Sequence, residues 1–555
     1  MNGAVLLLIA LGAFGLGYVV YSRFIERVLG IDPARATPAH AKRDDVDYVP
    51  AHPTVLFGHH FAAIAGAGPI VGPVLAAQFG WLSVCLWVVL GCIFIGAAHD
   101  MISLFLSVRH GGESIGSVIG SVMGKTGKVL FLLFSWSALV LVVAVFSSQI
   151  ADTFVADPAI ASSSLLFIAE AIVFGICVYR LKMPVLWASL VFVPLMFAFV
   201  WIGNLIPLDL MKLFSLSKAT THLVWCVVLL IYCFFASTCP VWVLLQPRDY
   251  LNAYLLYVMM ALGIAGVFVA HPVLRTNAFA GFNAEGLGGV APLLPILFVT
   301  VACGACSGFH SLVASGTSSK QLDNERSIRP IAYGGMLLEG VLAMIAVIGV
   351  AGTYASQSDY LAAIAGPERI SAVAMFASSV AGFAAKMGIP EKIANGFMLL
   401  SVSAFLMTTV DAGTRLARFS WQELMPEKAK LLKNMYFGTA LVCALAAGFL
   451  LGSESLRASL WTLFASANQL LATLTLLTMT IWFMKNKKPF LLTGIPACFM
   501  FVVSSWALAL KFTGGIFDGN FVMAATALFL LALGAVVVVL AIKEGSKCIG
   551  SSRRL

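Results

Sequence analysis

Ionisable side chains stand inside long apolar stretches of this 555-residue chain. They are His99, Asp100, Glu170, His310, Glu339 and Asp411. A charge at the centre of a bilayer costs at least about 2.5–3.5 kcal/mol on insertion scales, so such residues face the protein interior and usually have a role. A buried carboxyl group that exchanges a proton is one such role, and a satisfied polar contact is the alternative. For Asp100, an ion pair with Arg109 is that alternative.

Two adjacent histidines, His59 and His60, stand near the start of the stretch FGHHFAAIAGAGPIVGPVLAAQFGW at residues 57–81. Histidine titrates near neutral pH, so either residue is a candidate proton carrier or substrate ligand. Neighbouring residues on a helix point about 100° apart, and the pair can therefore hardly share one metal ion. Polar packing against backbone carbonyls at the membrane interface is the alternative. The proton-coupling candidates are His59, His60, His99, Asp100, Glu170 and Glu339.

Glycine and proline interrupt the same stretch at Gly66, Gly68 and Pro69. Irregular backbone survives in hydrocarbon only against protein or a water-filled cavity. A helix broken here would expose a half-helix N-terminus, whose free N–H groups suit a carboxylate. A continuous helix with close small-residue contacts is the alternative.

A second stretch, ACGACSGFHSLVASG at residues 302–316, repeats this mixture of small residues and histidine. It lies an odd number of spans later, so the two cross in opposite directions, as the broken helices of inverted-repeat transporters do. We predict that Ser307, Gly308 and His310 face Gly66, Gly68 and Pro69 across a substrate pocket. Cys303 and Cys306 have metal-site spacing, but nothing near them completes a tetrahedral site, and we expect no metal or other cofactor.

Two further segments carry weaker signals. Thr408 and Thr409 precede Asp411 in FLMTTVDAGTR, and their hydroxyls could bind Na⁺ if the helix unwinds there. Bonding back to their own helix is the alternative.

In CPVWVLLQPRDYLN at residues 239–252, we predict that Pro247 ends a helix at a structural hinge. A gate contact is the alternative for this segment.

Composition identifies the elements that must position these residues. The chain is 60% hydrophobic and only 11% charged, whereas a soluble domain is about 25% charged. Continuous apolar runs long enough to cross a bilayer predict an all-α integral membrane protein with about 15 transmembrane helices, within a range of 14–17. The stretch 368–390 is expected to be a re-entrant or interfacial helix. We divide the chain into an N-terminal helix and connector (1–56), a transporter core with inverted repeats (57–430) and a four-helix C-terminal region (431–555).

Lysine and arginine indicate the orientation, because they concentrate in cytoplasmic loops. With the N-terminus outside and the C-terminus in the cytoplasm, 26 of the 34 basic residues lie inside. The net charge of +9 largely reflects this bias and is no evidence for a nucleic-acid partner. The first apolar run lacks a preceding basic region, so we do not read it as a cleaved signal peptide.

Five motifs in order resemble the carbon starvation protein A family: FGHHFAAIAGAGPIVGP, AAHDMISLFLSVRHGGESIG, PVWVLLQPRDYLN, ACGACSGFHSLVASGTSSKQL and TTVDAGTRLARF. The resemblance covers about residues 1–430 and is looser beyond. It implies a fold similar to the amino acid–polyamine–organocation transporters, with two inverted repeats whose first helices are broken. It also implies uptake of peptides during carbon starvation or proton-coupled uptake of pyruvate.

We therefore predict a secondary transporter of the bacterial inner membrane, not an enzyme, that imports a peptide or pyruvate with H⁺ as the coupling ion. A haem-binding redox protein and a passive channel are the alternatives. A signalling subunit would need an output domain, and no soluble segment here is large enough. The sequence does not specify the oligomeric state.

Overall fold

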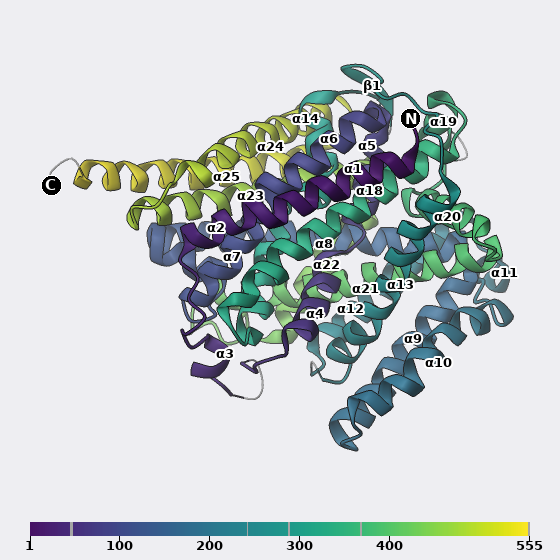
Figure 1. Cartoon of the computed structure of the whole chain (residues 1–555), viewed down its shortest axis with the longest axis horizontal. Coiled ribbons are helices and arrows are strands. Elements are labelled where there is room, and N and C mark those ends of the chain that lie inside the picture. The colour runs from purple at the N-terminus through teal and green to yellow at the C-terminus, as the bar shows by residue number, and fades with distance from the viewer. Residues whose placement is uncertain (45–47, 241, 287–288, 367–368, 553–555) are drawn as a thin grey trace.

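The computed structural model describes residues 1–44, 48–240, 242–286, 289–366 and 369–552, and these are almost wholly helical. Within these ranges the only sheet is an antiparallel hairpin of β1 (Asn283–Gly286) and β2 (Gly289–Pro292). The predicted all-α class is therefore confirmed. Figure 1 shows long helices stacked side by side, with the two termini at opposite ends of the molecule.

In the described chain, twelve helical stretches are long and apolar enough to span a membrane. They contain α1 (Gly3–Leu16) with α2 (Ser22–Leu29), α6 (Trp81–Gly91) with α7 (Ala97–Arg109), α8 (Ile115–Ala156), α9 (Pro158–Gly175), α10 (Val185–Leu205) with α11 (Leu210–Phe214), α12 (Lys218–Thr238), α13 (Leu245–Ala270), α18 (Gly335–Thr353), α21 (Glu391–Leu424), α23 (Glu454–Lys485), α24 (Leu491–Phe517) and α25 (Phe521–Ser552).

The remaining helices are shorter. They are α3 (Pro38–Ala41), α4 (Pro53–Ile64), α5 (Gly68–Ala76), α14 (Leu293–Thr300), α15 (Ala302–Ala305), α16 (Gly308–Val313), α17 (Ser319–Gln321), α19 (Gln357–Ala365), α20 (Ala372–Lys386) and α22 (Met435–Leu450). The bent pair α4–α5 raises the number of spans in the described chain to 13. The prediction of about fifteen is therefore two higher, and its two further runs correspond to the 16-residue α22 and to the interrupted segment α14–α16. Helix α20, in the stretch expected to be re-entrant or interfacial, has only 15 residues and packs among α13, α18 and α21.

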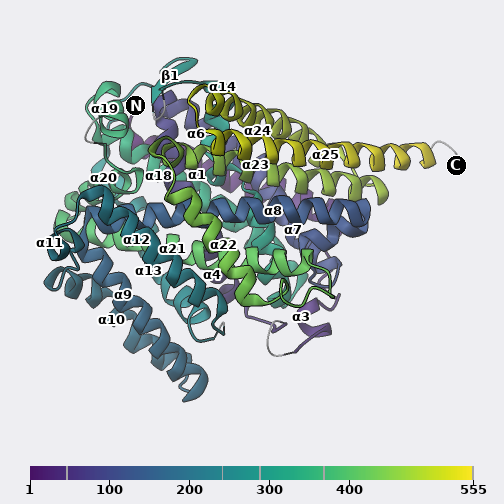
Figure 2. The ribbon, with the colours of Figure 1, turned by 180° about the vertical axis from the view of Figure 1, so that it is seen from behind.

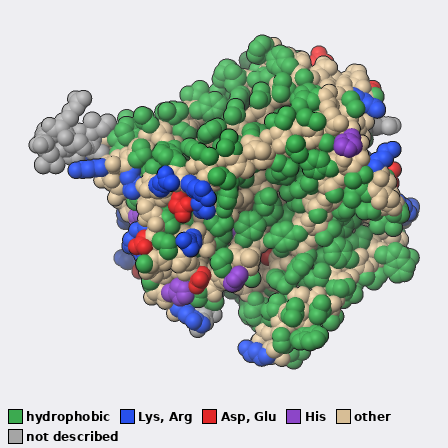
Figure 3. Space-filling model, viewed as in Figure 1, with side chains coloured by type: hydrophobic (Ala, Val, Ile, Leu, Met, Phe, Trp, Pro, Cys, Tyr) green, Lys and Arg blue, Asp and Glu red, His purple; other side chains and the backbone are tan. Residues whose placement is uncertain are grey.

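Burial separates an inner group of helices from an outer one. Helices α18, α21 and α23 are the most deeply buried, whereas α10 and α25 lie at the periphery. Figures 1 and 2 show α24 and α25 together along one flank, while α22 packs instead against α8, α12 and α21. In Figure 3 apolar side chains cover much of the visible face, and lysine and arginine gather toward the end near the C-terminus. This surface suits a bilayer flanked by basic loops.

The segment after α12 departs from the prediction. Helix α12 ends at Thr238, and α13 begins at Leu245, so Pro247 lies in the first turn of α13 and does not end a helix. Proline fits a first turn because an N–H there has no intrahelical partner. The expected helix end at Pro247 is therefore wrong, and the consequence is that Arg248 enters the protein interior, where it is fully buried.

Candidate functional site

The apolar run at residues 57–81 is broken where its glycines predicted. Helix α4 ends at Ile64, and α5 begins at Gly68 at an angle of 43°. The N–H of Gly66 donates to Ile64 O at 2.8 Å, and regular bonding resumes when Ile70 N–H donates to Ala67 O at 3.0 Å. Within the described chain the N–H groups of Ala67 and Gly68 donate no hydrogen bond. They form a small buried cluster of free donors at a half-helix N-terminus.

The second run is broken as well, between α15 and α16. Cys306 and Ser307 are extended, and α16 starts at Gly308. Here the free donor is capped, because Phe309 N–H donates to Oδ1 of Asn468 at 2.9 Å. The Asn468 amide also donates to Ser307 Oγ at 3.1 Å. Helix α23 therefore supplies a side chain that closes this half-helix N-terminus.

The two broken segments lie directly against each other. A Cβ atom on Gly72 would lie only 2.6 Å from Thr300 O, and one on Gly68 would collide with the Cys303 side chain. Cys303 Sγ lies 3.6 Å from Ser307 Oγ, so Gly68 and Ser307 both lie beside this cysteine. The close approach requires glycine, because any side chain would separate the helices.

The six residues predicted to bind substrate are all buried, but their neighbours differ from one residue to the next. Gly66 lies against α21, where an added Cβ would be 2.5 Å from Thr409 Oγ1. Pro69 stands in the first turn of α5 and leaves it one donor short. Gly308 packs against the backbone of α23, and this contact already occupies its open side.

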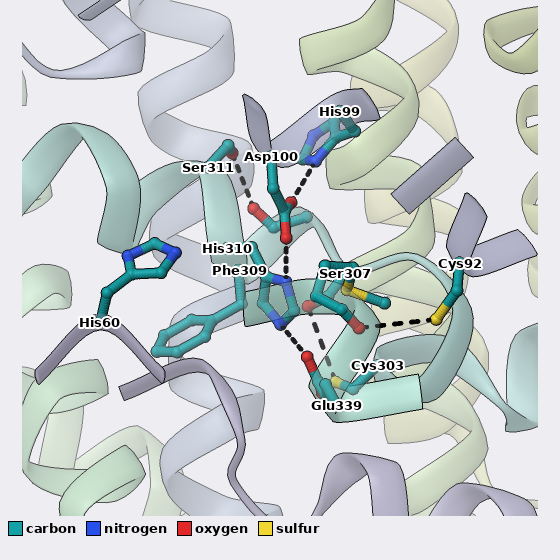
Figure 4. A network of polar contacts seen from close by, with 12 residues as sticks. His60, Cys92, His99, Asp100, Cys303, Ser307, Phe309, His310, Ser311 and Glu339 are labelled. Atoms are coloured by element: carbon teal, nitrogen blue, oxygen red, sulfur yellow. Dashed lines mark hydrogen bonds and ion pairs between the residues drawn. The ribbon is translucent and has the colours of Figure 1, made fainter. Parts of the chain in front are cut away.

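A buried group that we call the acid–histidine cluster joins three helices (Figure 4). Its members are His99, Asp100, His310 and Glu339, and all four are fully buried. Asp100 accepts from His99 Nδ1 at 2.9 Å and from His310 Nδ1 at 2.7 Å. On its other edge His310 Nε2 lies 3.3 Å from Glu339 Oε2, although neither atom has a hydrogen-bond partner among the described residues. The suggested pair of Asp100 with Arg109 is wrong, since Arg109 binds Glu325 at 2.9 Å.

The central imidazole can hold a proton in more than one place. A neutral histidine donates from one ring nitrogen only, whereas His310 presents both nitrogens to carboxyl groups. Both contacts are favourable if His310 is doubly protonated, or if Glu339 carries the proton. The 3.3 Å approach of His310 Nε2 to Glu339 is therefore favourable only when one of the two groups carries a proton.

The paired histidines diverge, as their spacing predicted. His60 is fully buried and its Nδ1 lies 2.7 Å from Ser318 Oγ; it stands beside the acid–histidine cluster in Figure 4. His59 faces α13, with Nδ1 3.7 Å from Asp249 Oδ2. Glu170 on α9 is only 4% exposed, and neither of its carboxyl oxygens has a hydrogen-bond partner among the described residues. Glu170 therefore takes no part in the contact of His59 with Asp249 or of His60 with Ser318.

A second buried group, which we call the Arg248 cluster, was not predicted from the sequence. It contains Tyr232, Arg248, Asp249, Asn252, Thr408 and Asp411. Arg248 forms a close ion pair with Asp411 and also donates to Tyr232. Tyr232 in turn donates to Asp411 Oδ2 at 2.8 Å. The sequence signal was an arginine beside an apolar run, which is also the ordinary signature of a helix end.

The threonines of α21 have partners that do not favour sodium. Thr408 Oγ1 accepts from Asn252 Nδ2 at 2.9 Å and from Arg248 Nη2 at 3.3 Å. Thr409 donates to the backbone of its own helix, at Phe405 O, 3.0 Å away. Helix α21 is continuous here, and Thr408 Oγ1 also donates to Ala404 O of its own helix at 3.1 Å. Among the described residues, moreover, no group of three or more His, Cys, Asp or Glu side chains could hold a metal ion.

Comparison with known proteins identifies relatives along nearly the whole chain. The family described as carbon starvation protein CstA matches residues 2–370 and 355–507. The peptide transporter CstA of Bacillus subtilis is 31% identical over 98% of this chain and 97% of its own length. That of Campylobacter jejuni is 33% identical over 90% and 79%, respectively. The pyruvate/proton symporter BtsT of Escherichia coli is 32% identical over 91% and 81%.

Among solved structures, the crystal structure of MhsT in complex with L-phenylalanine is similar at a TM-score of 0.47. The sequences are 13% identical, and the alignment covers 87% of this chain and 99% of that one.

Proposed function

Because the chain belongs to the carbon starvation protein CstA family, we propose that it is a proton-coupled secondary transporter importing a short peptide or pyruvate. The two substrate classes come from the names of its relatives, which are a peptide transporter and a pyruvate/proton symporter. Both substrates carry a carboxylate. The membrane is the bacterial inner membrane, with the N-terminus outside and the C-terminus in the cytoplasm.

The observation that carries this proposal is the break between α4 and α5. The free N–H groups of Ala67 and Gly68 lie at a half-helix N-terminus, where a carboxylate gains both hydrogen bonds and the helix dipole. The second broken segment differs, because Asn468 of α23 caps its Phe309 N–H. In this proposal Gly66, Gly68 and Pro69 shape the pocket, and Ser307 lines its far side.

The acid–histidine cluster provides the site for the coupling proton. Glu339 lies on α18, which packs directly against both α4 and α5. A proton that enters the cluster removes one negative charge from the space between these helices and α7. This change in charge shifts the balance between the outward-open and inward-open arrangements, which is how a bound ion drives alternating access. His60 connects α4 to this region through Ser318.

Reconstitution tests the proposal directly. Purified protein in liposomes with an alkaline interior should accumulate labelled pyruvate or alanyl-alanine above the external concentration. A protonophore should abolish the accumulation, and replacing Na⁺ by choline should not. Uptake that stops at the external concentration would identify a passive channel. Accumulation that follows a sodium gradient alone would remove the proton role of the cluster.

A further inference from the structure

A basic pocket lies at the end of the first apolar span, apart from both buried clusters. Its volume is about 370 Å³. Its lining residues are Arg23, Glu26, Arg27, Gly30, Ile31 and Arg329. The first five belong to α2 and the turn that ends it, whereas Arg329 begins the helical turn that continues into α18. The pocket therefore joins the first span to the span that carries Glu339.

The pocket has more positive charge than its own acid cancels. Arg329 Nη1 pairs with Glu26 Oε2 at 2.7 Å, and this pair accounts for the one carboxylate in the lining. Arg23 and Arg27 remain, and both are exposed. Neither of their side chains has a hydrogen bond or an ion pair among the described residues. Two unpaired guanidinium groups therefore face the same pocket.

The charged groups around the pocket leave this excess unchanged. Helix α2 packs against α7 and against the turn before α18. Arg109 of α7 donates to Gly30 O at 2.8 Å, but its charge is paired with Glu325 at 2.9 Å. Lys488 donates to a carbonyl group of α2 and adds one positive charge, which the exposed Asp32 offsets. The pocket with its neighbours thus keeps the two positive charges of Arg23 and Arg27, and it suits an anion.

The pocket lies where the lipid-facing side of the first span becomes basic. That span has 27 residues. It is therefore about 40 Å long, whereas the hydrocarbon is about 30 Å thick, so its last turns reach the lipid headgroups. Val20 and Phe24 are exposed apolar side chains, and Arg23 and Arg27 each follow one of them by three positions, on the same side of the helix. Figure 3 shows the blue side chains at this edge of the apolar face, over α2 as labelled in Figure 1.

Arginine at such a boundary suits a phosphate group that carries acyl chains. A guanidinium presents its N–H donors in a planar fork that matches the oxygens of a phosphate. Arg329 is held in place by Glu26 and by the Tyr18 ring, whose centroid lies 5.4 Å from its guanidinium carbon. Its Nε has no hydrogen-bond partner among the described residues. A free phosphate would use the arginines alone, whereas a phospholipid also covers Val20 and Phe24.

We propose that this pocket binds the phosphate group of an anionic phospholipid, whose acyl chains lie along the first span. The phosphate accepts hydrogen bonds from Arg23 and Arg27 and lies beside Arg329. One lipid molecule then connects the first span to the span of Glu339. This lipid site goes beyond the proposed function and requires only that the first span crosses the bilayer.

The test measures lipid binding without transport. The full-length protein in detergent is titrated with phosphatidylglycerol or with phosphatidylcholine of the same acyl chains, and bound lipid is counted by native mass spectrometry. Both lipids contain a phosphate, but phosphatidylcholine has no net charge. We expect phosphatidylglycerol to bind about tenfold or more tightly, because each basic residue near an anionic lipid contributes roughly fivefold. Equal affinities for the two lipids would overturn the proposal without any mutation.

A pair of matched variants then locates the lipid. The double substitution Arg23→Gln and Arg27→Gln removes the two unpaired charges and should reduce the preference for phosphatidylglycerol about tenfold. Lys428→Gln with Lys430→Gln removes two exposed charges from the loop after α21 and should preserve the preference. A full preference retained in the arginine variant, or an equal loss in both variants, would overturn the assignment to this pocket.

Glycerol 3-phosphate separates a lipid from a free phosphate, because it carries a similar anion without acyl chains. We expect millimolar glycerol 3-phosphate to leave phosphatidylglycerol bound. Displacement of the lipid by an equal concentration of glycerol 3-phosphate would show that the pocket takes a free phosphate, and would overturn the lipid assignment. Lipid binding and substrate accumulation are separate measurements, so loss of either leaves the other proposal standing.

Discussion

Glu339→Gln is the substitution that tests the coupling site most directly. Glu339 and His310 are fully buried and their facing atoms lie 3.3 Å apart. Glutamine keeps the size and polarity of the side chain but cannot take up the shared proton. His310 retains its contact with Asp100, so we expect a stability loss of only about 1–3 kcal/mol. The substitution should change the driving force for substrate accumulation far more than it changes stability. With one proton per cycle, each pH unit is worth about 1.36 kcal/mol, or tenfold accumulation.

The assay measures accumulation in liposomes at an imposed gradient of two pH units. Wild-type protein should approach a ratio of about one hundred, and Glu339→Gln a ratio of about one. Exchange of labelled for unlabelled substrate needs no net proton movement and should survive. Glu325→Gln is the matched control, because Glu325 is also buried and ion-paired, with Arg109. A wild-type ratio in Glu339→Gln refutes the coupling role, and loss of accumulation in both variants assigns the effect to stability.

Three other outcomes follow from the broken segments and their neighbours. Gly68→Ala places a Cβ against Cys303 and should abolish uptake, while adding Cys303→Gly should restore it in the same liposome assay. Asn468→Ala leaves a buried N–H unpaired and should lower the free energy of unfolding by about 1–3 kcal/mol in detergent. Asn204→Ala, which loses only a hydrogen bond within its own helix, should change the free energy of unfolding little. Thr408→Val should leave uptake equally independent of Na⁺, because the Thr408 hydroxyl is already bound to Arg248, Asn252 and the backbone of its own helix.

The break at Gly66–Pro69 was predictable because its cause is local. Glycine and proline weaken a helix wherever they stand, and a membrane offers no water to repair the loss. The divergence of His59 and His60 was predictable for the same reason, since it depends only on the helical repeat. The spans could be located from continuous apolar runs alone.

Partners across the fold could not be predicted in this way. Asp100 was compared with Arg109, one of the nearest charges along the chain, but its partner is His310, which lies 210 positions later in the sequence. Asn468 was missed because its role exists only where α16 begins opposite it. The polar residues Ser466, Asn468 and Gln469 inside that span were the available signal.

Arg248 shows why hydropathy misplaces some charges. An arginine beside an apolar run is normally a residue of the membrane surface, but α12 ends at Thr238 and α13 begins at Leu245, so that Arg248 lies in the first turns of a new helix and is buried. Arg415 and Arg418 make this possible, because they donate to carbonyl groups at the end of α12. Those carbonyls would otherwise need water.

Helix α4 is the element that relates the two buried groups to each other. His59 faces Asp249 of the Arg248 cluster, while His60 binds Ser318 and lies against Gly335 of α18, near the acid–histidine cluster. That helix ends at the break where the carboxylate is proposed to bind. If the carboxylate binds at this break and the proton enters the acid–histidine cluster, both act on the same short helix. Substrate and proton would then be coupled through the position of α4, without any direct contact between them.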